Sequence, residues 1–449
     1  MAAIIAADTR AEDAAGVYPT GRYGAFVVAA LFLAYFIAYL HRQVILILIP
    51  SLKVDLHVND TQVSLLAGLG TTALYIVAGI PLGRLADRTN RRNLIVVAVA
   101  LWSLATVFCG LARNFWELAI ARMILGLGEA ALGPASFSML VDYFPPSQRG
   151  RAIALMQTGT PLGSSAAVFG GGLFMSLYAS GTFAGLAPAG WPGWKELFIL
   201  FALPGFVVAA MLLLVREPPR RGAGALSGAA PALWPFLRRH ALAFWSLCVV
   251  FAGYSVIGYG VSVWTPTLLI RVHHFSMTQA GAVSGLILLL CSVPAYVAAG
   301  FLSDFLARWQ GVRGRAMAPL LLTPVLAASL VWLAFAKDLT GTMCALVLAF
   351  FIFSLASTTL PPALQAFLPN RLRGQALAIV MLVANLAGLG IAPTLIGAVT
   401  DYVFRDEMML QVSVGVVNAA VALLIMLVSI WMPRFYAEAC RTVEGEALP

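Results

Sequence analysis

Long stretches of apolar residues recur along the whole chain, and they restrict its possible folds more than any other feature. A helix needs about 20 residues to cross the hydrocarbon layer of a membrane, and twelve stretches are that long. The composition agrees, because 61% of the side chains are apolar and 10% are charged, whereas soluble globular chains are roughly 45–50% apolar and about 25% charged. The sequence predicts an all-α polytopic membrane protein and excludes a disordered chain, a disulfide scaffold and a soluble multidomain enzyme.

The predicted spans form two sets of six, separated by a connection rich in Gly, Ala, Pro and Arg. They lie at 22–50, 61–87, 91–112, 115–143, 148–180, 193–215, 241–272, 277–307, 314–336, 339–368, 371–401 and 409–434. The predicted organisation is an N-terminal segment 1–21, a six-helix bundle 22–215, a linker 216–240, a second six-helix bundle 241–434 and a tail 435–449.

Lysine and arginine are unevenly distributed between the two sets of loops. With both termini on one side, the loops of that side hold twenty of these residues and the opposite loops hold six. Basic loops stay in the cytoplasm, so we expect a multi-pass protein of the cell (inner) membrane with cytoplasmic termini. The same short loops explain the net charge of +9 without a nucleic-acid partner.

Two short motifs occur once in each half of the chain. The sequence Gly83-Arg-Leu-Ala-Asp87-Arg-Thr-Asn-Arg91-Arg92 has a weaker copy in Gly300-Phe-Leu-Ser-Asp304-Phe-Leu-Ala-Arg308, 217 residues later. Arg149-Gly-Arg-Ala-Ile-Ala has a copy in Arg373-Gly-Gln-Ala-Leu-Ala, 224 residues later. The halves are therefore duplicated modules in parallel orientation, an arrangement typical of transporters that rock one half against the other.

The motif at 83–92 resembles the loop signature of the major facilitator superfamily, and the resemblance covers essentially the whole chain. It implies two six-helix bundles that face a central cavity and work by alternating access. It also implies a cytoplasmic gate, in which Asp87 bonds to Arg88 or Arg91, or caps the helix that follows Arg371. Alternatively, these charges only set the topology. The implied gate residues are Gly83, Asp87, Arg88, Arg91, Arg92, Asp142, Arg149, Asp304, Arg308 and Arg373. Gly83 would permit close approach of two helices.

Four ionisable residues lie at hydrocarbon depth, all in the N-terminal half: His41, Arg42, Arg122 and Glu129. Such residues are costly in a membrane and normally line a functional cavity. Seven residues separate Arg122 from Glu129, which places them on one helix face. Burial and a neighbouring arginine shift the pKa of a carboxyl group in opposite senses, so Glu129 is the proton-binding candidate. Alternatively, it forms a permanent ion pair with Arg42 or Arg122.

The other charged candidates carry open alternatives. His41 could share the proton or simply face packed neighbours. Arg42 and Arg122 could bind an anionic headgroup, which suits a planar guanidinium. The sequence does not decide which arginine pairs with Glu129.

A narrower resemblance is to the spinster-type branch. It rests on Gly126-Leu-Gly128-Glu129-Ala, Asp142-Tyr-Phe-Pro145 and Pro161-Leu-Gly163-Ser164. It implies a proton-driven transporter of sphingolipids or lysophospholipids. That branch usually has Asp-Arg on the first helix, where this chain has His41-Arg42, so the usual carboxylate is missing.

The C-terminal half has no charge at hydrocarbon depth, and its cavity candidates are aromatic or weakly polar. The predicted substrate cavity comprises Tyr39, Arg42, Arg122, Glu129, Tyr254, Tyr259, Trp264 and Asn385. A charged wall opposite an apolar wall suits an amphiphile, although the aromatic residues could instead pack between helices.

We therefore expect a proton-coupled transporter of a lipid-like amphiphile, acting as a monomer without a metal or cofactor. The first alternative is a proton-coupled transporter of a small organic anion or drug. A membrane enzyme, receptor or channel is a distant alternative, because the sequence has neither clustered catalytic residues nor a filter sequence.

Overall fold

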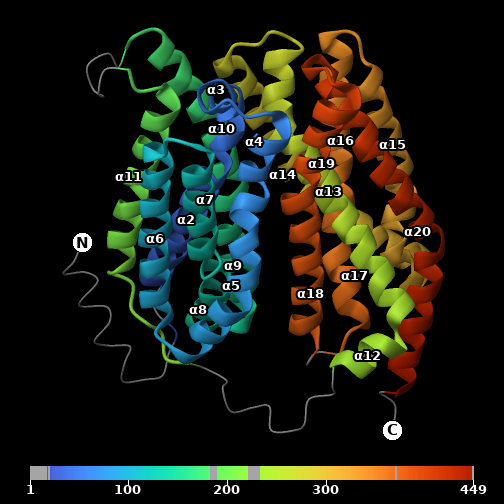
Figure 1. Ribbon diagram of the computed structural model, residues 1–449. Helices are drawn as coiled ribbons and strands as arrows, with labels where there is room; N and C mark the ends of the chain where they lie inside the picture. Colours follow the sequence, from blue (N-terminus) through green and yellow to red (C-terminus); the bar gives the residue numbers. More distant parts are fainter. Residues whose placement is uncertain (1–17, 19–20, 183–189, 221–232, 370–371, 447–449) are drawn as a thin grey trace. The chain divides into compact units, whose positions relative to one another are not determined.

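The computed structural model describes residue 18 and residues 21–182, 190–220, 233–369 and 372–446. All regular secondary structure in this part of the chain is helical. Twelve segments, each one helix or a run of consecutive helices, are long and apolar enough to cross a membrane (Figure 1). The predicted all-α fold with twelve spans is therefore confirmed.

Contacts divide the chain into two compact units. The N-terminal unit comprises Met1–Leu56 and Ala73–Ser227, and the C-terminal unit comprises His57–Thr72 and Gly228–Pro449. The sequence alone places residues 57–72 in the N-terminal bundle, whereas in the structure they pack with the C-terminal helices.

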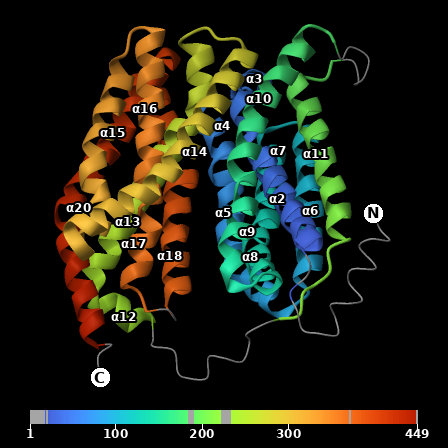
Figure 2. The ribbon, with the colours of Figure 1, turned by 180° about the vertical axis from the view of Figure 1, so that it is seen from behind.

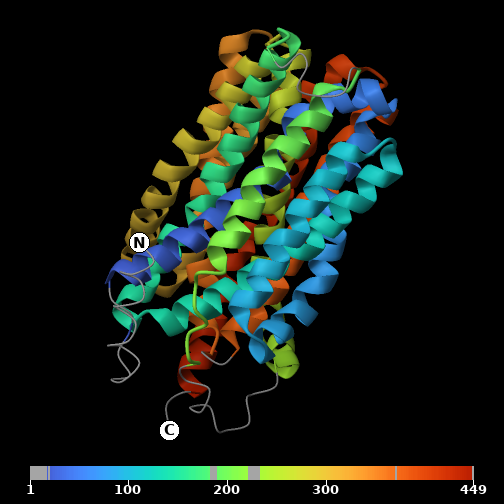
Figure 3. The ribbon, with the colours of Figure 1, turned by 90° about the vertical axis from the view of Figure 1, so that its left-hand side faces the viewer.

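The N-terminal unit consists of helices whose apolar faces pack along one another. Its helices are α2 (Gly21–Gln43), α3 (Ile45–Leu56), most of α5 (Leu69–Arg88), α6 (Arg91–Leu111), α7 (Phe115–Glu129), α8 (Leu132–Tyr143), α9 (Pro146–Gln157), α10 (Gly159–Ala179) and α11 (Gly193–Leu212). Helix α6 runs beside α11, and α10 packs against α2 (Figure 3). Asn90 and Asn114 accept hydrogen bonds from backbone N–H groups at the starts of α6 and α7, which fixes where these helices begin.

The C-terminal unit contains three long helices, of 31, 34 and 37 residues. Its helices are α4 (Asp60–Ala67), α12 (Leu233–Arg239), α13 (Ala241–Arg271), α14 (Met277–Gln310), α15 (Ala318–Phe335), α16 (Leu339–Thr358), α17 (Leu360–Phe367), α18 (Arg373–Asn385), α19 (Ala392–Ala398) and α20 (Leu410–Glu446). Helix α20 packs against α13 and α15, and α14 packs against α16 (Figure 2). A short 3₁₀ turn at Gly311–Ala316 connects α14 to α15, and another at Glu407–Met409 precedes α20.

The eleventh span is irregular. Two π-helical segments, Leu386–Ile391 and Val399–Phe404, flank the short helix α19. π-Helical turns are rare and often lie at functional positions. Gly388 allows one of them to approach Ser255 of α13 closely.

Polar contacts hold α4 within the C-terminal unit. Arg271 donates to both carboxylate oxygens of Asp60, at 2.7 and 2.9 Å. The backbone N–H and the hydroxyl of Thr61 both donate to one oxygen of Asp401, each at 2.7 Å. Asp60 is fully buried and Arg271 is partly exposed, so breaking this pair would leave a buried carboxylate without its counter-charge.

Candidate functional site

Arg42 and Glu129 form an ion pair inside the N-terminal unit. The Nε and Nη2 atoms of Arg42 both donate to Oε2 of Glu129, the first at 2.7 Å. Both side chains are buried, with exposed fractions of 8% and 2%. Within the described part of the chain, Oε1 of Glu129 makes no hydrogen bond. Of the two arginines considered from the sequence, Arg42 is therefore the one whose side chain bonds to Glu129.

Two tyrosine rings frame this ion pair. The guanidinium carbon of Arg42 lies 5.3 Å from the ring centre of Tyr39 and 5.1 Å from that of Tyr75. Both distances are in the range of a cation–π contact, which strengthens in a desolvated site. Tyr75 on α5 was not predicted from the sequence, because an isolated tyrosine on an apolar helix does not reveal which way it faces.

Arg122 bonds to backbone atoms of α2. It donates to the carbonyl oxygens of His41 at 3.3 Å and of Arg42 at 3.0 Å. These carbonyls lie at the end of α2, where the last turn of a helix leaves carbonyl groups without intrahelical partners. Arg122 is fully buried, so in this structure it holds the end of α2 and is not open to a ligand.

His41 is also fully buried, and it faces α11. Its Nε2 lies 2.6 Å from the carbonyl oxygen of Phe201, so the ring donates a hydrogen bond there. Its Nδ1 has no hydrogen-bond partner among the described residues. The packed surroundings match the alternative that the sequence left open, and a role for His41 in proton binding stays a prediction.

Helix breaks bring these charges together. Helix α2 ends one residue after Arg42, and α7 ends at Glu129. Each span then continues as a second helix, α3 or α8, after a gap of one or two residues. A break in a span exposes polar backbone groups, and buried charged side chains near it can satisfy them.

The aromatic candidates of the C-terminal unit lie in two environments. Tyr254 and Trp264 are fully buried: the Tyr254 hydroxyl bonds with Thr323 at 2.7 Å, and the Trp264 indole donates to the carbonyl of Pro393 at 3.0 Å. They are part of the interior of this unit, not of a surface open to substrate. Tyr259 and Asn385 are half-buried, and Asn385 is the last residue of α18 before a π-helical segment.

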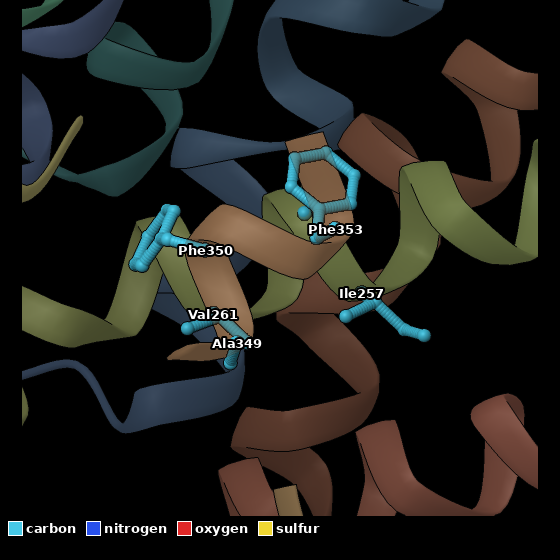
Figure 4. A pocket seen from close by; sticks show the side chains of 6 residues that line it. Ile257, Val261, Ala349, Phe350 and Phe353 are labelled. Carbon is cyan, nitrogen blue, oxygen red and sulfur yellow. The ribbon is translucent and has the colours of Figure 1, made fainter. Parts of the chain in front are cut away.

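A narrow apolar recess separates α13 from α16 in the same unit. Its lining is entirely apolar (Figure 4). The ring of Phe353 lies against Gly258, where a β-carbon would collide with it. The recess is too narrow to hold a water molecule, so any ligand could enter only after a neighbouring side chain such as Phe353 turned away.

Arg91 is the centre of a polar cluster at the start of α6. It donates to Glu217 at 2.6 Å, to the Ser138 hydroxyl at 2.8 Å, to the Pro218 carbonyl at 3.0 Å and to Asp142. Of the alternative partners that the sequence offers Asp87, Arg91 bonds elsewhere in this structure, because its guanidinium donates to these four groups. Glu217 was not predicted, since it follows the sixth span in a loop whose position the sequence does not give.

Asp87 and Arg88 are exposed, and neither forms an ion pair with a described residue of the N-terminal unit. A β-carbon at Gly83 would meet nothing nearer than Pro134 at 3.9 Å, so no close helix approach requires this glycine. The role of Asp87 in a cytoplasmic gate stays a prediction.

The remaining gate candidates are dispersed over both units. The Arg92 side chain donates to the carbonyl of Leu213 at 2.9 Å, and Arg149 donates to the carbonyl of Phe144 at 2.8 Å. Asp304 and Arg308 are exposed, and the side chain of Arg373 lies outside the described residues. Among the described residues, no group of three or more His, Cys, Asp or Glu could hold a metal ion.

Comparison with known proteins identifies the family of this chain. Residues 31–393 match the model of the Major Facilitator Superfamily. The hexuronate transporter of Bacillus subtilis is 25% identical over 391 residues, 84% of this chain and 87% of that protein. An MFS-type efflux pump of Mycolicibacterium smegmatis is 27% identical over 281 residues, 60% of this chain and 61% of the pump. The chain thus spans less than two thirds of the pump.

Spinster proteins are also among the relatives. Human protein spinster homolog 1 is 26% identical over 258 residues, 55% of this chain and 46% of that protein. A solved structure is also similar: the crystal structure of a bacterial homolog to the human lysosomal transporter Spinster, in an inward-facing and occupied conformation. Its sequence is 25% identical, its TM-score is 0.74, and the match covers 94% of this chain and 98% of that chain. These relatives are transporters by name, which agrees with the expectation that the chain is not an enzyme. The chain belongs to the Major Facilitator Superfamily and resembles its spinster-type members.

Proposed function

We propose that this chain is a secondary active transporter that works by alternating access and couples proton binding at Glu129 to the movement of an anionic, lipid-like substrate. The buried ion pair between Arg42 and Glu129 carries this proposal. Charged side chains inside a membrane span are costly to insert, and those that occur there usually have a function. In this pair, one member can bind a ligand once the other is neutralised.

Protonation of Glu129 would free Arg42. A neutral carboxylic acid no longer balances the guanidinium, so Arg42 then favours another anion. An anionic headgroup on Arg42 in turn favours the protonated form of Glu129, because binding free energies are coupled reciprocally. The proton and the anionic group therefore bind together, which makes a proton gradient able to drive transport.

The surroundings of Arg42 favour an amphiphilic substrate. Tyr39 and Tyr75 offer aromatic surface beside the guanidinium. The resemblance of the motifs at 126–130, 142–145 and 161–164 to the spinster-type branch implies a lipid-like substrate of the lysophospholipid or sphingolipid type.

A small organic anion is the second candidate substrate. The hexuronate transporter matches over 84% of this chain, and its name gives a sugar acid, whose carboxylate would suit Arg42 equally well. Neither substrate needs a metal or cofactor in this site. We also propose that the protein acts as a monomer in the cell (inner) membrane with cytoplasmic termini, where the motif at 83–92 would serve as the gate.

Transport by purified protein in liposomes tests the proposal. The panel contains a lysophospholipid, a sphingoid base and glucuronate, each assayed with and without a pH gradient. We expect the lysophospholipid to be transported, faster with the gradient, and glucuronate to compete poorly. Transport of glucuronate alone would favour the second candidate, and transport that ignores the gradient for every substrate would remove proton coupling.

A further inference from the structure

A cavity of about 400 Å³ opens in the C-terminal unit, far in the sequence from the Arg42–Glu129 pair. It lies where α12 and the first turn of α13 meet the last turns of α20. Figures 1 and 2 both show α12 at the end of this unit that carries the C-terminus. Cavities that hold small ligands in proteins have about 300–1,000 Å³, so this one is large enough for a headgroup.

The polar lining of this cavity is mainly basic. It includes Arg238, Arg239, His240, Thr442 and one carboxylate, that of Glu438. Both arginines are exposed, so a ligand can reach them from the membrane surface. The rest of the lining is apolar and includes Leu242 and Phe435. A site with guanidinium groups on one side and apolar groups on the other suits an anionic group that is attached to an acyl chain.

Exposed tryptophans place the cavity at the depth of the lipid headgroups. Trp234, Trp245 and Trp431 are 53%, 41% and 53% exposed, and they lie on the three helices that form the cavity. Tryptophan concentrates at the boundary between hydrocarbon and headgroups. Arginines accompany two of them, with Arg238 5.6 Å from the ring centre of Trp234 and Arg434 5.4 Å from that of Trp431.

We propose that this cavity binds the phosphate of an anionic membrane lipid, with Arg238 and Arg239 as its ligands. The planar guanidinium can donate two parallel hydrogen bonds to phosphate, and basic pockets at the membrane surface are suited to anionic headgroups. Leu242, 64% exposed beside the cavity, would contact the first part of the acyl chain. Glu438 repels the phosphate, so the phosphate lies nearer α12 than α20.

Lipid binding to the full-length protein in detergent, followed by native mass spectrometry, tests the proposal. The probes are phosphatidylglycerol and phosphatidylcholine with identical acyl chains. We expect phosphatidylglycerol to bind more tightly. Arg238→Gln and Arg239→Gln should each weaken its binding about fivefold, from the contribution of one basic residue at a membrane surface. Glu438→Gln should strengthen it by a similar factor.

Arg151→Gln, at an exposed arginine of α9 in the other unit, is the matched control and should leave binding unchanged. Equal binding of the two lipids, or equal weakening by Arg239→Gln and Arg151→Gln, would overturn the site. Inorganic phosphate tests the source of the anion: if it competes as well as the lipid does, the acyl chain plays no part and the lipid assignment is overturned. Transport assays are not needed, so failure here leaves the proposed function untouched.

Discussion

Arg122 donates a hydrogen bond to the backbone carbonyl oxygen of Arg42 at 3.0 Å, so one buried arginine supports the helix end that presents the other. The sequence offers both residues as ligands for an anion. The structure separates them, because Arg42 directs its side chain to Glu129 while Arg122 bonds to backbone oxygens. This difference predicts that substitutions of the two arginines have different effects.

Arg122→Met should destabilise the protein. The carbonyl oxygens of His41 and Arg42 would lose their donor, and unsatisfied buried polar groups cost about 1–3 kcal/mol each. We expect a clear fall in the thermal unfolding temperature of the detergent-solubilised protein, by several degrees. Arg113→Met, at an exposed arginine between spans, is the control. Equal unfolding temperatures of both variants would show that Arg122 does not support α2.

Arg42→Lys should reduce transport by roughly tenfold or more. Lysine keeps the charge but loses the planar donor pair that contacts Glu129 and would contact an anionic headgroup. Arg42→Ala should abolish transport. Initial rates in liposomes measure both effects. If the lysine variant retains most of the activity, Arg42 serves only to balance the charge of Glu129.

Glu129→Gln should remove the pH dependence of transport, because an amide cannot take up a proton. The variant should also lose the response of its conformation to pH, measured as distances between spin labels at pH 4 and pH 8. Glu117→Gln, on the exposed start of the same helix, should keep both responses. An unchanged pH response in Glu129→Gln rules out the proton-binding role.

Asp60→Asn should loosen α4 from the C-terminal unit. Removing one partner of a buried ion pair costs about 3–5 kcal/mol, and we expect a loss near the lower end of this range because Arg271 keeps its contacts with Glu407. Hydrogen exchange of residues 57–72 should then accelerate by on the order of 100-fold or more. Asp55→Asn is the control, because Asp55 accepts a hydrogen bond from Trp194 within the other unit. Hydrogen exchange of residues 57–72 in this variant should match that of the unmodified protein. Unchanged protection in Asp60→Asn contradicts the attachment.

Asp142→Asn and Asp87→Asn should differ in their effect on stability. Asp142 bonds to the buried guanidinium of Arg91, whereas Asp87 is exposed. We expect only Asp142→Asn to lower the unfolding temperature. Asp87→Asn should instead change the accessibility of a label at the start of α9, because loss of a gate contact shifts the balance between conformations. If accessibility does not change, Asp87 only helps to set the topology.

The periodicity and length of apolar stretches were enough to predict the twelve spans, since a membrane-spanning helix leaves a strong signal in composition. The sequence also gave the reason to consider a pair between Arg42 and Glu129, because charges at hydrocarbon depth are few. It could not choose the partner of Glu129, since two arginines were equally available and only side-chain direction distinguishes them.

Contacts made by backbone groups and loops could not be predicted from the sequence. The break after α2 lies in the segment Gln43-Val44-Ile45, which has neither glycine nor proline, so nothing marks the carbonyls that Arg122 serves. Glu217 lies far along the chain from Arg91, and Asp60 far from Arg271. Both pairs depend on how loops and helices fold back, which a single sequence does not encode in any local pattern.

The ion pair in the N-terminal unit has a consequence for biosynthesis. Its two members are 87 residues apart, so the first span leaves the ribosome well before the fourth. The fourth, Phe115–Tyr143, has a mean hydropathy of 1.4, against 2.1 for Gly21–Leu56, and each charge near a span centre disfavours release into lipid by about 2.5–3.5 kcal/mol. The less apolar fourth span is therefore the one that we expect to depend on the first, because Glu129 enters lipid more favourably beside Arg42 than alone, and this dependence sets an assembly order for this half of the protein.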